Sequence, residues 1–344
     1  MKKIILIGGI GTDTSFVGGE HSKNMHLISA LQDCGRIVVP ADLADLRKHP
    51  WKGFRALWVL FKHPNANVII SSSLRRAGWL IKWLHILDSR RNICFVGTGR
   101  EFSKKIADGV FSAKYFRNVR SIIVQGEKMK TELESVGLHA IVLPNFKHIE
   151  YLPDLSNKER GIARFAFLSR MQKEKGVNLI IQSINKLNSD GLGNEFTVDF
   201  YGLFEDPEYK KEVFDSIKEM SNVHYEGVLD LRKSIGYDRL ANHTAMLFPT
   251  FWPGEGFPGI IIDALIAGLP MIASDWHFNS DYIEMGKTGV IIPNQDLRAL
   301  YDAMSDVIKH PQKYEQMSEY CQQQAMKYNT KNIINEDFLT MINM

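Results

Sequence analysis

The chain of 344 residues is long enough for two domains of ordinary size. Hydrophobic residues make up 44% of it and charged residues 24%, a composition that excludes a disordered chain. The net charge of +3 is unevenly spread, because residues 1–150 contain 23 Lys and Arg against 12 Asp and Glu (+11), and the remainder balances at −8. The basic half predicts contact with an anionic partner, such as a nucleic acid, an acidic lipid or a phosphorylated substrate.

The amino-terminal run Met1–Gly8 is predicted to be a first strand, because its apolar stretch is too short for a signal sequence and ends in glycines. No apolar stretch approaches the ~20 residues that a membrane span needs. The cysteines are far apart and lack the spacing of disulfides or metal ligands, which is typical of a reducing compartment: Cys34, Cys94 and Cys321. We therefore expect a cytoplasmic protein, with peripheral attachment to the inner face of the cell membrane left open.

In the first half, short β-rich runs alternate with helical patterns. Strands are predicted at Ile4–Ile7, Ile37–Val39, Val68–Ser71, Ile93–Val96, Ile122–Val124 and Ile141–Leu143. Helices between them are predicted at Ser22–Asp33, Leu74–Leu87 and Glu127–Val136. Continuous apolar strands alternating with helices indicate a parallel sheet covered on both faces.

The polar stretch 153–161 interrupts the pattern and is the best linker candidate. Strands then resume at Arg164–Leu168, Thr197–Tyr201, Val223–Tyr225, Ala245–Pro249, Met271–Ala273 and Val290–Ile292, and the region from Leu297 to Ile342 is predicted to be entirely helical. We expect an α/β protein with two Rossmann-like domains that face each other across a cleft. Their limits are predicted as 1–152 and 153–326, with residues 327–344 forming a helix that packs back on the first domain.

The strongest motif is the run 253–270, which directly follows a predicted strand. Glycines flank Glu255, so the backbone there can approach a ligand closely. A helix predicted to begin near Gly259 directs its N–H groups to the same place, which suits a phosphate. Asp263 lies eight residues after Glu255, about one turn into that helix. A surface loop with a capping Glu is the alternative interpretation of this spacing.

Two further segments carry candidate binding residues. Arg170 and Lys175 follow the first strand of the second domain and precede Gly176, an arrangement that can clamp a diphosphate and that also fits a solvated loop. Gly18 and Gly19 precede the first long helix, where the backbone can approach an oxyanion. His21 beside them is a candidate for proton transfer or simply a surface residue.

Taken together, these motifs resemble family 4 of the retaining glycosyltransferases, which have the GT-B fold. Glu255 and Asp263 resemble that family's motif of two glutamates separated by seven residues, and Arg170 with Lys175 and Gly176 resembles its diphosphate loop. Other residues also match the usual sequence of this family, namely Ala264, Gly268-Leu269-Pro270 and Leu143-Pro144-Asn145. The resemblance is strong over residues 164–293 and weak over residues 1–150.

The resemblance implies a glycosyltransferase of the hexosyltransferase type, with an acceptor-binding first domain and a donor-binding second domain. Arg170 and Lys175 would neutralise the leaving diphosphate, and Asp263 would bind the ribose. The transferred sugar and its phosphate would be held by Glu255 with the backbone of Gly256, Phe257, Pro258 and Gly259. Gly18 and Gly19 would lie under the diphosphate from the other domain. The implied donor is a nucleotide sugar, slightly favouring a UDP-sugar, with no other cofactor and no metal.

The sequence departs from the family pattern at three positions. Arg100 stands near the place where many members have a histidine, and with His21 it is the candidate on the acceptor side. Asp263 replaces the second glutamate and is one methylene shorter. Pro258 lacks an N–H and so removes one donor from the turn.

Two basic stretches rich in tryptophan lie in the first half, at 51–62 and 75–85. Tryptophans and cations on one helix suit a membrane interface, whereas ordinary helices with buried tryptophans give the same pattern. Because the first half also has a net positive charge, we favour the membrane interpretation. It predicts an anionic membrane surface as partner and a lipid-linked saccharide as acceptor, as in bacterial polysaccharide assembly.

Other functions have weaker support in the sequence. Gly9 and Gly11 after the first strand suggest a dinucleotide-dependent oxidoreductase, but Thr14 replaces the third glycine of that fingerprint. A nucleotide-sugar epimerase has the same fold. A non-catalytic homologue that binds a nucleotide sugar, or scaffolds a glycosyltransferase complex, is the alternative from another class. Nucleic-acid binding lacks any recognition motif.

Overall fold

The structure, a computed structural model, describes residues 3–11, 19–87, 90–99, 101–158 and 161–344. It divides into two compact units, the first formed by Met1–His148 with Tyr328–Met344 and the second by Ile149–Lys327. The limits expected from the sequence, after residues 152 and 326, lie close to these boundaries. The cleft expected between the two domains stays a prediction.

The first unit is built on a six-stranded parallel sheet with the strand order β2-β1-β3-β4-β5-β6. Its strands are β1 (Lys3–Gly8), β2 (Ile37–Asp42), β3 (Asn67–Ser72), β4 (Ile93–Gly97), β5 (Ser121–Val124) and β6 (Ala140–Val142). The helices between them are α1 (Gly19–Asp33), α2 (Trp51–Lys62), α3 (Leu74–Ile86), α4 (Glu101–Ala107), η1 (Ala113–Phe116) and α5 (Glu127–Glu134). The central strands are buried along nearly their whole length, as continuous apolar runs require.

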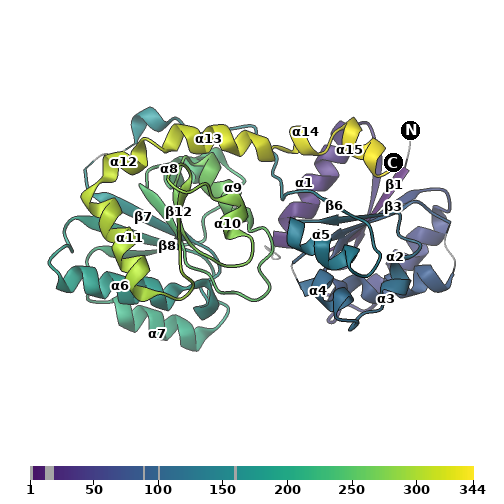
Figure 1. Cartoon of the computed structure of the whole chain (residues 1–344), viewed down its shortest axis with the longest axis horizontal. Helices are drawn as coiled ribbons and strands as arrows, with labels where there is room; N and C mark the ends of the chain where they lie inside the picture. Colours follow the sequence, from purple (N-terminus) through teal and green to yellow (C-terminus); the bar gives the residue numbers. More distant parts are fainter. Residues whose placement is uncertain (1–2, 12–18, 88–89, 100, 159–160) are drawn as a thin grey trace. The chain divides into compact units, whose positions relative to one another are not determined.

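The end of the chain returns to complete the core of the first unit. Helices α14 (Thr330–Ile333) and α15 (Glu336–Met341) lie above the sheet in Figure 1, whereas α2 and α3 lie below it. One apolar cluster joins β1 and α1 to this segment and contains Ile4, Leu6, Leu27, Leu31, Ile333, Phe338, Leu339 and Ile342. The first unit therefore needs residues from both ends of the described chain.

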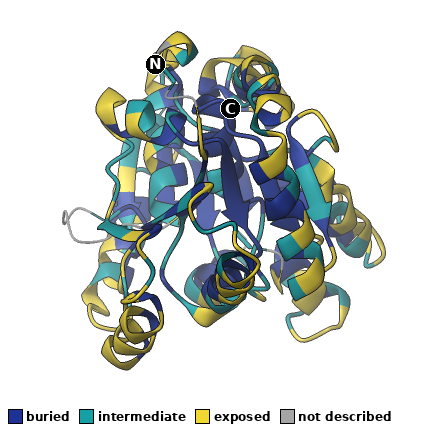
Figure 2. Cartoon of the chain, turned by 90° about the vertical axis from the view of Figure 1, so that its left-hand side faces the viewer, coloured by how far each residue is buried: buried dark blue, intermediate teal, exposed yellow. Residues whose placement is uncertain are grey.

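The second unit repeats the architecture with the strand order β12-β11-β10-β7-β8-β9. Its strands are β7 (Ala163–Leu168), β8 (Phe196–Tyr201), β9 (Val223–Gly227), β10 (Ala245–Phe248), β11 (Met271–Ser274) and β12 (Gly289–Ile292). Its helices up to β12 are η2 (Leu155–Asn157), η3 (Lys173–Lys175), α6 (Val177–Ser189), α7 (Pro207–Ile217), α8 (Ser234–Ala241), α9 (Gly259–Ile266) and α10 (Asn279–Tyr282). Figure 2 shows buried strands between helices whose outer faces are exposed.

The region after β12 is helical, as predicted, but it consists of separate pieces, and residues 327–344 do not form the single helix that was expected there. The pieces are α11 (Leu297–Lys309), α12 (Pro311–Glu315), α13 (Ser318–Ala325), η4 (Met326–Tyr328), α14 and α15. Pro311 ends α11 because it cannot donate the next helical hydrogen bond. The side chains of Asn329 and Asn335 start new helices by accepting the N–H groups of Lys331 and Phe338.

Each strand predicted from the sequence coincides or overlaps with one of these strands, so the predicted fold of two parallel α/β sheets is confirmed. The strand order reverses between β1 and β3 in the first sheet and between β7 and β10 in the second. Sheets of this kind bind ligands outside the carboxyl ends of the strands at that point. The loops that leave these four strands are therefore the places to examine for function.

Candidate active site

In the second unit, the loop after β7 (residues 169–176) and the loop after β10 (residues 249–258) lie against each other. The N–H of Phe251 donates to the carbonyl of Glu174 at 2.8 Å, and the hydroxyl oxygen of Thr250 lies 3.3 Å from the same carbonyl oxygen. Both loops leave the carboxyl edge of the sheet where the strand order reverses. The two strongest sequence motifs of this half are thus brought to one place.

Lys175 and Glu255 form a buried ion pair across these loops. The distance from Lys175 Nζ to Glu255 Oε2 is 2.5 Å, and the side chains are 7% and 12% exposed. The hydroxyl of Thr250 donates to the same carboxylate oxygen at 3.1 Å. Burial lowers the pKa of Lys175, and the Glu255 carboxylate partly offsets this effect. The ammonium group lies in a poorly solvated position, where its field on a bound phosphate would be strong.

Trp252 lies beside both candidate cations. Its ring centre is 5.2 Å from the Arg170 guanidinium and 5.9 Å from Lys175 Nζ. Arg170 is more exposed than Lys175, and its Nη1 is 3.7 Å from Glu205 Oε2. One cation of the predicted clamp is therefore buried and paired with a carboxylate, and the other is partly exposed beside an aromatic ring. Trp252 was not predicted from the sequence, although it is an aromatic residue four positions after a buried strand.

Gly176 allows the two loops to approach. Its φ is 85°, and a Cβ at this position would lie 2.3 Å from the carbonyl oxygen of Pro249. It also ends η3 and precedes α6, so the direction of the chain after Lys175 depends on it. Only glycine fits both the left-handed backbone and the contact.

Helix α9 begins at Gly259, with Pro258 in the position before it. Its first turn has N–H groups without helical acceptors, a favourable place for an anion. Pro258 contributes no N–H, as the sequence indicated, but its carbonyl accepts the N–H of Ile261 at 3.1 Å. The Phe257 side chain is buried and stacked on Tyr282 with the ring centres 3.8 Å apart, so only its backbone can face a ligand. Gly256 lies between Phe257 and Glu255.

Asp263 is buried on the second turn of α9. Its Oδ1 accepts a hydrogen bond from the hydroxyl of Tyr237 on α8 at 2.7 Å. Burial and the Asp263 carboxylate both raise the pKa of Tyr237, so the phenol remains a donor. Tyr237 orients Asp263, and this pairing could not be predicted from the sequence because 26 positions separate the two residues.

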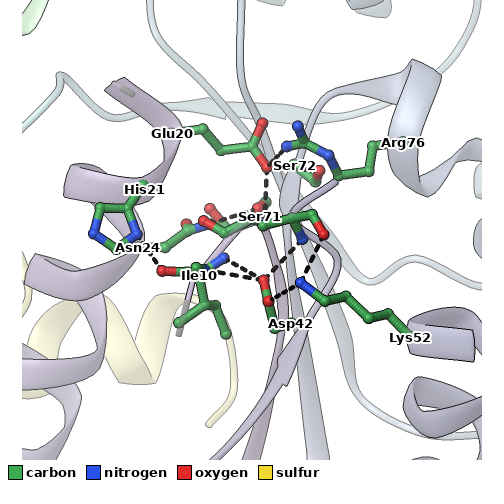
Figure 3. A network of polar contacts seen from close by, with 12 residues as sticks. Ile10, Glu20, His21, Asn24, Asp42, Lys52, Ser71, Ser72 and Arg76 are labelled. Carbon is green, nitrogen blue, oxygen red and sulfur yellow. Dashed lines mark hydrogen bonds and ion pairs between the residues drawn. The ribbon is translucent and has the colours of Figure 1, made fainter. Parts of the chain in front are cut away.

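In the first unit, the amides directly after β1 are already bound by carboxylates (Figure 3). Glu20 accepts the N–H of Gly9 at 2.9 Å and also contacts Ser72 and Arg76. Asp42 accepts the N–H groups of residues 10, 11 and 44 at 2.8–3.0 Å and pairs with a lysine of α2, Lys52, at 2.7 Å. Since these amides are engaged, they do not form the open cradle that a dinucleotide pyrophosphate requires.

The electrostatic balance at Asp42 favours its ionised form. Burial alone would raise the pKa of Asp42. The hydrogen bonds from Lys52 and from the backbone lower it by more than burial raises it, so the pKa lies below its ordinary value. Asn24 on α1 completes the network by donating to the carbonyls of Gly9 and Ser71 at 3.2 and 3.1 Å. None of these residues was singled out from the sequence, because each is an ordinary polar residue until the strands bring it to this edge.

The remaining predicted residues belong to the first unit. Gly18 and Arg100 lie outside the described residues, so their parts in donor and acceptor binding stay predictions. Gly19 is the first residue of α1, and, apart from its chain neighbours and its own helix, no atom of the described residues lies within 4 Å of a Cβ built there. The ring of His21 contacts the carbonyl oxygen of Ile10 through Nδ1 (Figure 3). His21 therefore lies at the carboxyl edge of the first sheet.

Within the described ranges, no group of three or more His, Cys, Asp or Glu side chains is arranged to hold a metal ion. The cysteines are all unpaired, and Cys94 and Cys321 are buried. None of the helices in the described part of the chain combines the length and apolar character needed to cross a bilayer.

Residues 154–324 match the family described as glycosyl transferases group 1. The second unit carries a glycosyl transferase group 1 domain. The match includes all of the site residues described above between Arg170 and Asp263. The prediction of a glycosyltransferase domain is therefore confirmed at this level.

Curated relatives agree with this assignment. The chain is 26% identical over 156 residues, 44% of its length, to the D-rhamnosyltransferase WbpZ of Pseudomonas aeruginosa. It is 25% identical over 242 residues, 64% of its length, to an uncharacterized glycosyltransferase of Methanocaldococcus jannaschii. These matches span 38% and 56% of the relatives' own lengths.

Solved structures share the fold of the whole chain. Sucrose-phosphate synthase from Thermosynechococcus elongatus aligns over 99% of this chain and 97% of its own, with a TM-score of 0.76 and 16% identity. HepE of Anabaena, solved in complex with UDP and glucose, aligns over 100% of both chains with a TM-score of 0.73 and 14% identity. The arrangement of two six-stranded parallel sheets is thus that of known GT-B glycosyltransferases.

Proposed function

We propose that the protein transfers a sugar from a nucleoside diphosphate sugar to an acceptor hydroxyl, with retention of the anomeric configuration. The observation that carries the proposal is the buried pair of Lys175 and Glu255 within a glycosyl transferase group 1 domain. The pair lies where the strand order reverses and is linked by the loop after β10 to the start of α9. A cation, a carboxylate and a helix N-terminus together suit a ligand that has both phosphates and hydroxyls.

The proposed chemistry depends on charge that develops during transfer. The bond between the anomeric carbon and the phosphate oxygen breaks, and the nucleoside diphosphate leaves with the electron pair. Lys175, Arg170 and the first N–H groups of α9 stabilise the negative charge on the leaving group more strongly than they stabilise the bound donor. Glu255 holds hydroxyls of the transferred sugar. A bond then forms between the acceptor oxygen and the same face of the anomeric carbon, and the proton of the acceptor hydroxyl passes to the departing diphosphate oxygen.

Asp263 is proposed to bind the ribose hydroxyls of the donor. Tyr237 fixes the orientation of the Asp263 carboxylate, and a carboxylate held in one orientation suits the recognition of a pair of hydroxyls. A UDP-sugar is slightly favoured as the donor, and no metal is required for the proposed steps. The acceptor class proposed is a saccharide, lipid-linked or free, of the kind used for cell-surface glycans.

A thermal-shift series tests donor binding. Purified protein is heated with UDP, GDP, ADP, CMP or NAD, because a ligand that binds the native state raises the unfolding midpoint. We expect a shift with one nucleoside diphosphate that is lost in Arg170→Ala and Asp263→Ala. Lys173→Ala is the matched control, since Lys173 belongs to the same loop but is exposed and paired with Glu212. A shift with NAD alone, or none with any nucleotide, would contradict the proposal.

Turnover separates the enzyme from a non-catalytic homologue that only binds nucleotide sugars. The nucleotide that stabilises the protein identifies the donor series, and release of that nucleotide is then measured with candidate saccharides. Lys175→Ala is expected to lower turnover by roughly 10²–10³-fold, the effect of removing one oxyanion donor. Donor binding without release of the nucleotide with any saccharide would favour the binding homologue.

A further inference from the structure

Helix α2 exposes a stripe of aromatic side chains. They recur at intervals of three and four residues and so share one face of the helix. Their exposed fractions are 53% for Trp51, 75% for Phe54, 57% for Trp58 and 84% for Phe61. The residues that α2 buries against the unit are different ones, namely Gly53, Ala56, Val59 and Leu60. The helix therefore has a second apolar face that the fold of the first unit does not use.

Helix α3 extends this surface. A Cβ at Gly53 of α2 would lie 3.5 Å from the ring of Trp79, so the two helices pack closely at that point. Trp83 and Ile86 follow Trp79 by four and seven residues, which places them on the same side of α3. They are 49% and 73% exposed. Arg91, five residues after the end of α3, donates to the carbonyls of Leu60 and His63 at the end of α2, both at 2.7 Å.

Basic residues predominate in the sequence that forms this surface, and two of them, Lys52 and Arg76, are paired with Asp42 and Glu20. From Leu46 to Leu87 the sequence contains no Asp and no Glu, but it contains Arg47, Lys48, Lys52, Arg55, Lys62, Arg75, Arg76 and Lys82. Arg47, Lys48, Arg55 and Lys62 are exposed around the aromatic stripe. The ammonium of Lys62 is 5.0 Å from the centre of the Trp58 ring. Single exposed apolar residues are common, but a row of them among cations marks an interaction surface.

We propose that the face formed by Trp51, Phe54, Trp58 and Phe61 of α2, with Trp83 and Ile86 of α3, lies on a bilayer surface that contains anionic lipid. Helix α2 would lie in the plane of the interface, with its aromatic rings at the depth of the headgroups and its cations against lipid phosphates. The uninterrupted basic character of this stretch matches an anionic surface. The proposal concerns attachment and does not depend on the reaction at the donor site.

Vesicle flotation tests the attachment. The full chain is mixed with vesicles of phosphatidylglycerol and phosphatidylcholine, or with phosphatidylcholine alone, at low salt. We expect flotation with the mixed vesicles, weaker or no flotation with phosphatidylcholine alone, and release of the protein from the mixed vesicles as salt increases. In wild-type protein, brominated lipid is expected to quench tryptophan fluorescence, which provides a readout that needs no variant.

Two variants assign the binding to this face. Phe54→Ser with Phe61→Ser is expected to reduce partitioning into mixed vesicles by roughly tenfold or more, because two large apolar side chains no longer enter the interface. The control replaces two similarly exposed apolar residues of the second unit, Val228→Ser with Ile235→Ser (63% and 68% exposed), and is expected to float like wild type.

Three outcomes would overturn the proposal. The first is no flotation of wild-type protein with anionic vesicles, and the second is equal flotation of wild type and the Phe54/Phe61 variant while wild-type tryptophan fluorescence is not quenched. The third is a wild-type dimer in solution that the variant converts to a monomer without any vesicle binding, which would make the face a contact between two copies of the chain. Circular dichroism and the unfolding midpoint show that the compared variants are folded.

Discussion

The Nζ atom of Lys175 lies 2.5 Å from Oε2 of Glu255, although the two residues are 80 positions apart and follow different strands. Each side chain compensates the buried charge of the other. When one partner of such a pair is removed, the other is left as an uncompensated charge in a poorly solvated place, which is more costly than removing both.

A double-mutant cycle on this pair should therefore be strongly non-additive. Lys175→Met and Glu255→Gln are each expected to reduce the free energy of unfolding by about 3–5 kcal/mol, and the double variant by clearly less than their sum. Urea denaturation measures all three. The exposed pair Lys173 and Glu212, at 3.0 Å, is the control, with a coupling of about 0–1 kcal/mol expected. Additive effects at Lys175 and Glu255 would show that the pair is not coupled.

Gly176→Ala should destabilise the protein more than Gly191→Ala. Both glycines have a φ of 85°, so both variants carry the strain of a left-handed alanine, about 1–2 kcal/mol. The new Cβ at position 176 would in addition meet the Pro249 carbonyl at 2.3 Å, whereas at position 191 no described residue other than the chain neighbours has an atom within 4 Å. The difference between the two unfolding free energies isolates the contact between the loops. Equal losses would mean that the loops adjust freely.

Tyr237→Phe should weaken both the fold and nucleotide binding. The substitution removes the donor that Asp263 uses at 2.7 Å and leaves a buried carboxylate with one partner fewer, a loss of about 1–3 kcal/mol. Tyr301→Phe removes a similar bond of 2.6 Å to Asp190 at the surface and is expected to change stability by less than about 1 kcal/mol. Denaturation and nucleotide titration of both variants check the prediction. A Tyr237→Phe protein with unchanged nucleotide affinity would separate Tyr237 from the donor site.

Lys23→Met is expected to stabilise the protein in a manner that depends on pH. Burial lowers the pKa of Lys23 from 10.5 to about 8, so between those values the unfolded chain binds more protons and wild-type stability rises with pH. The variant has no buried ammonium group, so its stability does not change with pH for this reason. The excess of its free energy of unfolding over that of wild type should be largest below pH 8, with an upper limit of about 3 kcal/mol, and should shrink towards pH 10. Denaturation at pH 7 and pH 10 measures the change, and a constant difference would contradict a buried charge at Lys23.

The sequence predicted the fold well because its signals are local. Apolar runs such as Ile4–Ile7 and Ile122–Val124 are enough to place strands, and alternation with helices is enough to indicate a parallel sheet. Most breaks in the last helical region could not be predicted from the sequence, since they depend on weak capping by residues such as Asn329 and Asn335. The break at Pro311 could be predicted, because proline ends a helix.

At the candidate site, the sequence identified residues with unusual neighbours and missed those with ordinary ones. Glu255 stands between glycines and Lys175 precedes one, so both were found. Trp252, Thr250 and Tyr237 became visible only after folding, because their roles depend on contacts between separate strands and helices. The same is true of Glu20 and Asp42 in the first unit, which occupy the amides that glycine spacing alone had suggested for a dinucleotide.

The return of residues 328–344 to the first unit has a consequence for synthesis of the chain. Ile333, Phe338, Leu339 and Ile342 are translated after every residue of the second unit, yet they fill the core around Ile4 and Leu27. Until these residues leave the ribosome, the first unit keeps an apolar surface open, although its sheet is made first. The half of the chain that is translated first is therefore among the last parts to complete its core.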